Sequence, residues 1–246
     1  MHTMSKPNDE RHIHINTDTN ALAEDLALFV GTKLGEALFT KKHSTLVVSG
    51  GTTPRPFFRQ LSTLTLDWEQ VTVTLADERA VGEQDNQSNA AFIKDNLLIG
   101  RAAAAQFIPL FNDGDDAPSA AEKNAHLLAQ LPTYDVVVLG MGHDGHTASI
   151  FPQSPQRDNA LAADQDLAAL WADPVTATPM RITQTANRLL NADQIVLHIT
   201  GQEKATLLER ILTKPDPKQW PISHFLTQTR VPVAIFSDHT ISPSNT

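Results

Sequence analysis

The chain has 246 residues, of which 41% are hydrophobic and 19% are charged, a balance typical of globular proteins that excludes a disordered or fibrous chain. The formal net charge is −9 and the 19 lysines and arginines are scattered, which argues against duplex nucleic acid or an anionic membrane surface as a partner. The absence of cysteine excludes disulfide frameworks, thiolate chemistry and zinc sites with sulfur ligands.

The N-terminal segment has no apolar core of the kind found in signal peptides. Residues 1–11 are polar, and no segment approaches the ~18 apolar residues of a membrane span. We therefore predict a soluble cytoplasmic protein with a flexible N-terminal extension over residues 1–10 and a single domain over residues 11–246. No heptad or apolar stripe distinguishes a monomer from a homodimer.

Short β-rich runs alternate with helical patterns along the chain. Strands are predicted at 12–15, 45–48, 71–75, 134–139, 194–199 and 233–236, and helices at 21–39, 57–64, 88–98, 117–131 and 202–212. The segments 102–105, 113–121 and 153–166 are typical of surface connections. This order predicts a Rossmann-like α/β fold: a mostly parallel sheet with helices on both faces, and a ligand beyond the carboxyl ends of the strands.

The loop from Ser49 to Pro54 (SGGTTP) lies between a predicted strand and a predicted helix. Adjacent glycines, Gly50 and Gly51, allow backbone N–H groups to converge on an anion such as phosphate, and Thr52 adds a hydroxyl donor. It is not a Walker loop. An ordinary tight turn, with Pro54 starting the helix, fits the same residues equally well.

A second loop carries Asp77, Glu78 and Arg79 directly after the predicted strand at 71–75, with Ser88 placed to cap the next helix. Such a triplet can supply a general base, an orienting carboxylate and a guanidinium fork for an oxyanion or phosphate. A charged, solvated loop is the alternative interpretation.

The third loop, residues 140–149 (GMGHDGHTAS), follows the most strand-like segment of the chain. Its glycines fit the G-x-G-x-x-G pattern of dinucleotide-binding loops. The loop lies past the middle of the chain, however, and residues 160–169 offer Asp164 and Asp166 without a strand that ends in an acid, so this fit is poor.

His146 in the third loop is a candidate general acid or base, with Asp144 nearby to orient it. Capping of the following helix is the alternative role. Metal binding is discounted, since His143, His12 and His14 do not complete a ligand set with His146. No G-x-S-x-G elbow is present, which favours hydrolysis by activated water over a serine nucleophile.

Taken together, SGGTTPRPFFRQL, ADERAV with a later SN, and YDVVVLGMGHDGHTASIFP resemble the 6-phosphogluconolactonase family, in this order along the chain. The resemblance is strong over residues 45–151 and looser through MRITQT, the helix with Lys204, and VPVAIF. The family is similar to the glucosamine-6-phosphate deaminases, which share its α/β fold and its D-G-H loop. The deaminase pattern continues with Asn-Glu-Pro, whereas residues 150–153 (IFPQ) contain no glutamate, which favours a lactonase.

The resemblance implies hydrolysis of a phosphorylated sugar lactone, 6-phospho-D-glucono-1,5-lactone, in the second step of the oxidative pentose phosphate pathway, without cofactor or metal. It implies His146 as the catalytic acid/base, with Asp144 as its partner; Asp77 or Glu78 can share the role of base. The residues expected around the substrate are Ser49, Gly50, Gly51, Thr52, Arg79, Gly142, Arg181 and Lys204. The alternatives are a deaminase-like isomerase, a non-catalytic sugar-phosphate sensor and an NAD-dependent dehydrogenase.

Overall fold

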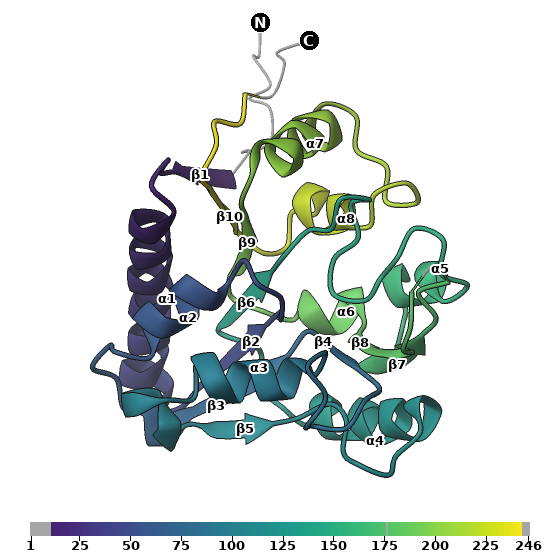
Figure 1. Ribbon diagram of the computed structural model, residues 1–246, viewed down its shortest axis with the longest axis horizontal. Helices are drawn as coiled ribbons and strands as arrows, with labels where there is room; N and C mark the ends of the chain where they lie inside the picture. The colour runs from purple at the N-terminus through teal and green to yellow at the C-terminus, as the bar shows by residue number, and fades with distance from the viewer. Residues whose placement is uncertain (1–10, 176, 243–246) are drawn as a thin grey trace, which may run out of the picture.

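The computed structural model in Figure 1 describes residues 11–175 and 177–242. Within these residues, seven strands form one parallel sheet in the order β1-β10-β9-β6-β2-β3-β5. Their bounds are Arg11–Ile15 (β1), Ser44–Val48 (β2), Val71–Leu75 (β3), Gln106–Ile108 (β5), Val136–Leu139 (β6), Ile195–Ile199 (β9) and Val233–Ser237 (β10). The predicted α/β fold with a mostly parallel sheet is confirmed. The predicted flexible extension over residues 1–10 lies outside the described residues.

Side chains of the central strands alternate between two apolar clusters, one on each face of the sheet. In β2, Leu46 and Val48 belong to the first cluster and Val47 to the second. The helices that cover the first face are α1 (Thr19–Lys41), α2 (Arg55–Leu61), α3 (Asn89–Asn96) and α4 (Ala117–Ala129). Those of the second are α5 (Arg157–Leu161), α6 (Ala186–Leu189), α7 (Gln202–Thr213) and α8 (Ile222–Thr227). Burial on both faces explains why β6 is a continuous apolar run and why β2 and β9 are mostly apolar.

The long helix α1 is fixed at both of its ends. At its start, the carboxylate of Asp18 accepts hydrogen bonds from the backbone N–H groups of the first turn. At its end, the Lys41 ammonium lies 2.8 Å from Asp135 and 2.7 Å from Asp193. The Asp135 carboxylate also accepts a hydrogen bond from the backbone N–H of Thr45 in β2, at 2.7 Å. These contacts hold the amino ends of the strands, so the carboxyl ends are left to the loops that line the site.

A second, antiparallel sheet of three strands is also present in the described part of the chain, in the order β4-β8-β7. It consists of Asp77–Arg79 (β4), Arg181–Gln184 (β8) and Ala169–Ala172 (β7). The prediction of a loop at Asp77–Arg79 was therefore wrong, because pairing with the distant β8 makes these residues a strand. The predicted surface connection at 153–166 contains α5, so that prediction was wrong in part.

Figure 1 shows α1 and α2 along one side of the parallel sheet and α6 and α8 on the other. The small sheet lies beside α4, at the end of the molecule opposite β1. None of the helices in residues 11–175 and 177–242 is long and apolar enough to cross a membrane.

Candidate active site

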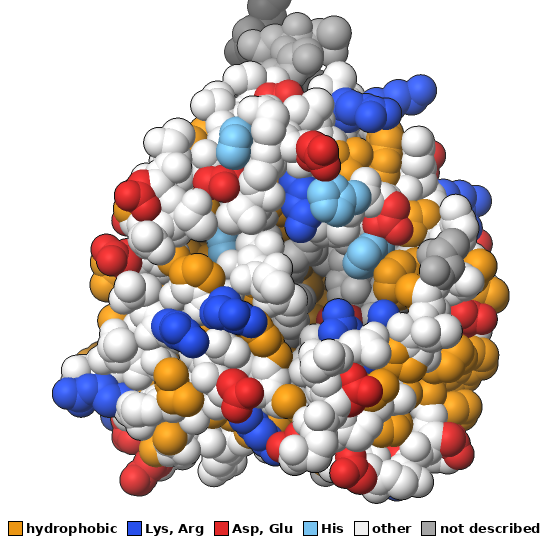
Figure 2. Space-filling view, in the orientation of Figure 1, with side chains coloured by type: hydrophobic (Ala, Val, Ile, Leu, Met, Phe, Trp, Pro, Cys, Tyr) orange, Lys and Arg blue, Asp and Glu red, His pale blue; other side chains and the backbone are white. Residues whose placement is uncertain are grey.

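A cavity of about 270 Å³ opens at the carboxyl ends of the central strands. Figure 2 shows it as a hollow near the centre of the face, with basic and histidine side chains around it. The lining residues are Ser49 to Pro54, Asp77, Arg79, Asn89, residues 138–142, His146, Thr147, Ala148, His198 and Lys204. Residues from all three loops singled out in the sequence therefore meet in one place, together with residues of α3, β9 and α7.

The loop after β2 needs its glycines. Gly51 has a φ of 103°, in a backbone region that residues other than glycine rarely adopt. A Cβ on Gly50 would lie 2.0 Å from Oδ1 of Asn89, so only glycine permits this close approach. The Ser49 hydroxyl is buried with no hydrogen-bond partner in the described residues. The loop thus combines a tight turn before α2 with a concave lining of the cavity.

The loop after β6 holds His146 beside Asp144. Nδ1 of the imidazole lies 2.5 Å from Oδ1 of Asp144, and the backbone N–H of His146 donates to the same oxygen at 3.1 Å. Because an ionised carboxylate can only accept, Nδ1 carries the proton and Nε2 of the neutral ring keeps its lone pair. Burial acts to raise the pKa of Asp144, but its hydrogen bonds with His146, and its attraction to that ring when the ring is protonated, lower it overall. The pair is therefore set up to transfer a proton through Nε2.

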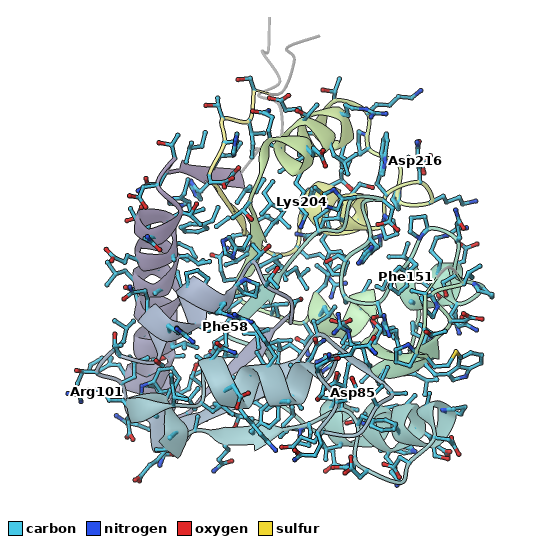
Figure 3. All side chains as sticks on the ribbon, viewed as in Figure 1. Phe58, Asp85, Arg101, Phe151, Lys204 and Asp216 are labelled. Atoms are coloured by element: carbon cyan, nitrogen blue, oxygen red, sulfur yellow. The ribbon has the colours of Figure 1, made fainter. Side chains whose placement is uncertain are left out.

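Glycines also shape the surroundings of His146. A Cβ on Gly142 would lie 2.2 Å from the imidazole, and one on Gly145 would lie 2.6 Å from Trp220. The ring of Phe151, labelled in Figure 3, lies 4.5 Å from the imidazole, centroid to centroid. The His146 side chain is 30% exposed, so it is supported by packing and still open to the cavity.

The alternation of β4 separates the two acids of the Asp-Glu-Arg triplet. Asp77 and Arg79 line the cavity, and the Asp77 carboxylate accepts a hydrogen bond from the Ser149 hydroxyl at 2.5 Å. Glu78 points the other way and does not line the cavity. Its carboxylate accepts backbone N–H groups of Arg79 at 2.6 Å and of Asn89 and Ala90, both at 2.7 Å.

Burial raises the pKa of Glu78, against the lowering effect of these hydrogen bonds. Its contacts are those of a carboxylate that holds the first turn of α3. Between the two acids proposed for the role of base, the geometry therefore favours Asp77.

Of the three basic residues predicted around the substrate, two line the cavity and one does not. Arg79 borders the cavity, donates to the backbone carbonyl of Gln87 at 2.6 Å and keeps a buried Nε without a partner in the described residues. Lys204, labelled beneath α7 in Figure 3, borders the cavity and has no ion-pair partner among the described residues. Burial lowers the pKa of Lys204. Arg181 pairs with Arg79 across β4 and β8 but does not line the cavity.

Several cavity residues lay outside the predicted set, among them His198 and Asn89. His198 interrupts an otherwise aliphatic strand, IVLHI, near the carboxyl end of β9, which is a signal that the sequence offered. Asn89 donates from its side chain to the backbone carbonyl of Asp77 at 2.9 Å, a contact that only the fold reveals. The histidines considered for metal binding are not gathered, and the described residues hold no group of three or more metal-ligating side chains.

Comparisons with known proteins agree on one family. Residues 17–233 match a family model described as glucosamine-6-phosphate isomerases/6-phosphogluconolactonase. A 6-phosphogluconolactonase of Rhizobium meliloti is 40% identical over 226 residues, which cover 92% of this chain and 97% of the relative. One from Pseudomonas aeruginosa is 41% identical over 216 residues, covering 87% and 89% respectively.

Solved structures give the same result for the fold. A 6-phosphogluconolactonase from Shewanella baltica has a TM-score of 0.87 at 37% identity, covering 92% of this chain and 96% of that one. A monomeric glucosamine-6-phosphate deaminase has a TM-score of 0.75 at 18% identity, with coverages of 91% and 96%, and shares the fold alone.

Proposed function

This chain belongs to the family of glucosamine-6-phosphate isomerases and 6-phosphogluconolactonases, and on that basis we propose that it hydrolyses 6-phospho-D-glucono-1,5-lactone to 6-phospho-D-gluconate. This reaction is the second step of the oxidative pentose phosphate pathway. The observation that carries the proposal is the His146 imidazole, hydrogen-bonded to Asp144, which lines one cavity together with a glycine-rich loop and two basic side chains.

The proposed mechanism uses Nε2 of His146 as the proton relay. Nε2 takes a proton from a water molecule as the water oxygen attacks the lactone carbonyl carbon. When the bond from that carbon to the ring oxygen breaks, the imidazolium returns the proton to the departing oxygen. Such general acid–base catalysis contributes roughly 10² to 10⁴ in rate. Asp144 holds the ring in the required tautomer and stabilises the transient positive charge.

Charge on the carbonyl oxygen has to be stabilised during the attack. Arg79 and the backbone N–H groups of the glycine-rich loops are the donors nearest to this task. Asp77, held by the Ser149 hydroxyl, faces the same cavity and is positioned to orient the water or share its proton.

The phosphate of the substrate does not react, so its role is positioning. We propose that it binds between the loop from Gly50 to Thr53 and Lys204, where backbone N–H groups, hydroxyls and a cation without an ion-pair partner in the described chain come together. Arg181, paired with Arg79 on the neighbouring strand and outside the cavity lining, then acts on the phosphate through its charge rather than by contact.

The deaminase reaction is the competing proposal within the same family. It needs a ring-opening acid after the D-G-H segment, and residues 150–153 supply none. Release of ammonia from glucosamine 6-phosphate would decide for the deaminase.

The decisive experiment generates the lactone in situ and follows its loss at mildly acidic pH, where spontaneous hydrolysis is slow. Wild type, His146→Ala and His143→Ala are compared, because His143 is in the same loop but 72% exposed and outside the cavity lining. We expect rapid loss with wild type and His143→Ala, and near-background loss with His146→Ala. Loss unaffected by His146→Ala would keep the lactonase and move the base to Asp77; no acceleration by wild type would reject the proposed function.

A further inference from the structure

His198 is a buried histidine for which the proposed chemistry has no use. It lies in β9, paired in register with Phe236 of β10, and it is 5% exposed. Its ring is edge-on to Phe57 of α2, 6.3 Å between centroids, and borders the cavity. An aliphatic residue, like the other four of the strand, would fill this position without a polar group.

The imidazole of His198 is held in its neutral form. Burial lowers its pKa to about 4, with Lys204 acting in the same direction and Asp238 in the opposite one. Nδ1 is buried with no hydrogen-bond partner among the described residues. A buried polar atom without a hydrogen-bond partner destabilises the folded state by about 1–3 kcal/mol. Packing alone therefore does not explain why a polar side chain occupies this position.

The surroundings of His198 are those of an anion site. Lys204 is close enough to lower the pKa of the ring, and it borders the same cavity. The hydroxyls of Thr53 and Thr200 lie 3.5 Å apart, which joins the glycine-rich loop to the segment just after His198. The Ser49 hydroxyl, buried at the same cavity, is likewise without a partner in the part of the chain that the structure describes.

We infer that His198 is a phosphate-binding residue of this site, which donates its imidazole N–H to a phosphate oxygen of the bound sugar. The inference rests on the proposed function, to which it adds one specificity-determining residue. A neutral donor in the cavity lining leaves the positive charge to Lys204 and favours a phosphorylated lactone over one without phosphate. A bound phosphate would also supply a partner to a ring for which the described residues provide none.

The test compares His198→Leu, which removes the donor, with His198→Gln, which retains an N–H donor on a side chain of similar reach. His14→Gln is the matched control, because His14 also contacts Phe236, with ring centroids 4.4 Å apart, but lies outside the cavity lining. Thermal unfolding verifies that each variant is folded. The measured quantities are KM and kcat for the lactone, and the affinity for inorganic phosphate by calorimetry.

We expect His198→Leu to raise KM and weaken phosphate binding about tenfold, with little change in kcat, as the loss of one binding contact predicts. His198→Gln should recover most of both, and His14→Gln should match wild type. Phosphate binding by folded His198→Leu equal to that of wild type would overturn the inference, and so would a wild type that binds no phosphate.

The phosphate titration does not depend on turnover. If wild type binds phosphate through His198 but hydrolyses no lactone, the proposed function fails and the inference stands. If the lactone is hydrolysed but His198→Leu binds phosphate normally, the inference alone fails.

Discussion

Gly142 lies so close to the imidazole of His146 that the ring can keep its position only if residue 142 has no side chain. Any side chain at position 142 would begin 2.2 Å from that ring, well inside van der Waals contact. The loop between them is closed by two backbone hydrogen bonds, from Gly142 to His146 at 2.9 Å and from Gly145 to Gly142 at 3.0 Å. The position of the His146 ring, the proposed proton relay, is therefore set by the backbone, which leaves it little freedom to adjust.

We expect Gly142→Ala to lower kcat by about 10², because displacement of a catalytic group by roughly 1 Å has a cost of that order. The thermal midpoint should fall only slightly, since the loop lies at the surface of the cavity. Gly35→Ala, whose Cβ would make an ordinary 3.7 Å contact with Leu66, is the control. Wild-type turnover by Gly142→Ala would show that the ring position is not critical.

At the scale of elements, the first turn of α3 depends on Glu78. Both carboxylate oxygens accept backbone N–H groups, and an amide in the same place would turn a donor toward one of them. We expect Glu78→Gln to lower the free energy of unfolding by about 1–3 kcal/mol in denaturant titrations. The shape of the pH–rate profile should stay that of wild type. If the variant instead lost the rise or the fall of activity with pH that wild type shows, Glu78 would be the base. Glu83→Gln, which removes only an exposed ion pair with Lys94, is the control.

The raised pKa of Glu78 also gives a pH dependence of stability. The folded state keeps this proton at pH values where the unfolded chain has lost it, so the contribution of Glu78 to stability decreases as pH rises from 4.5 through the raised value. Glu78→Gln should lack this decrease. Denaturant titrations of both proteins across this range would show it, and parallel curves would contradict it.

The first turn of α1 is capped by the side chain of Asp18. Asp18 accepts the backbone N–H of Asn20 at 2.8 Å and that of Ala21 at 3.2 Å. We expect Asp18→Ala to lower the free energy of unfolding by about 1 kcal/mol, and Asp18→Asn to lower it by much less, because asparagine also caps helices. Equal losses in the two variants would mean that the charge matters rather than the cap.

The elements that could be predicted are those with a long or strongly periodic pattern. Val136–Leu139 is buried on both faces and reads as a central strand, and α1 has a regular apolar stripe. The strands β4, β7 and β8 have only three or four residues each, too few to show a period. The pairing of β4 with β8 joins segments that are far apart in the chain, which local sequence does not encode.

The same limit explains what was missed in the site. Had Asp77–Arg79 been predicted as a strand, alternation alone would have sent Asp77 and Arg79 to one side and Glu78 to the other. Three loops at the carboxyl ends of strands could be predicted to meet, because a parallel sheet brings those ends together. The role of each residue in that site stays a prediction, as do the single domain, the oligomeric state and the cytoplasmic location.

At the level of the whole molecule, the burial of His198 in its neutral form predicts that the folded state loses stability in acid. Its pKa is lowered from 6.5 to about 4, so between these values the unfolded chain binds a proton that the folded state excludes. Stability therefore falls as pH drops through this window, by about 3 kcal/mol for a shift of this size. His198→Gln should lose this part of the dependence. Equal acid midpoints in denaturant-free titrations would show that other groups dominate.

The strand order has a consequence for how the molecule is made. β10 lies between β9 and β1, and it is the last strand of the described chain, whereas β1 is the first. During synthesis on the ribosome, β1 therefore has no strand to pair with until β10, the last strand of the described chain, has been made. A chain released before β10 would have an open slot within its sheet rather than a shortened edge, with the strand that carries His198 exposed along one side.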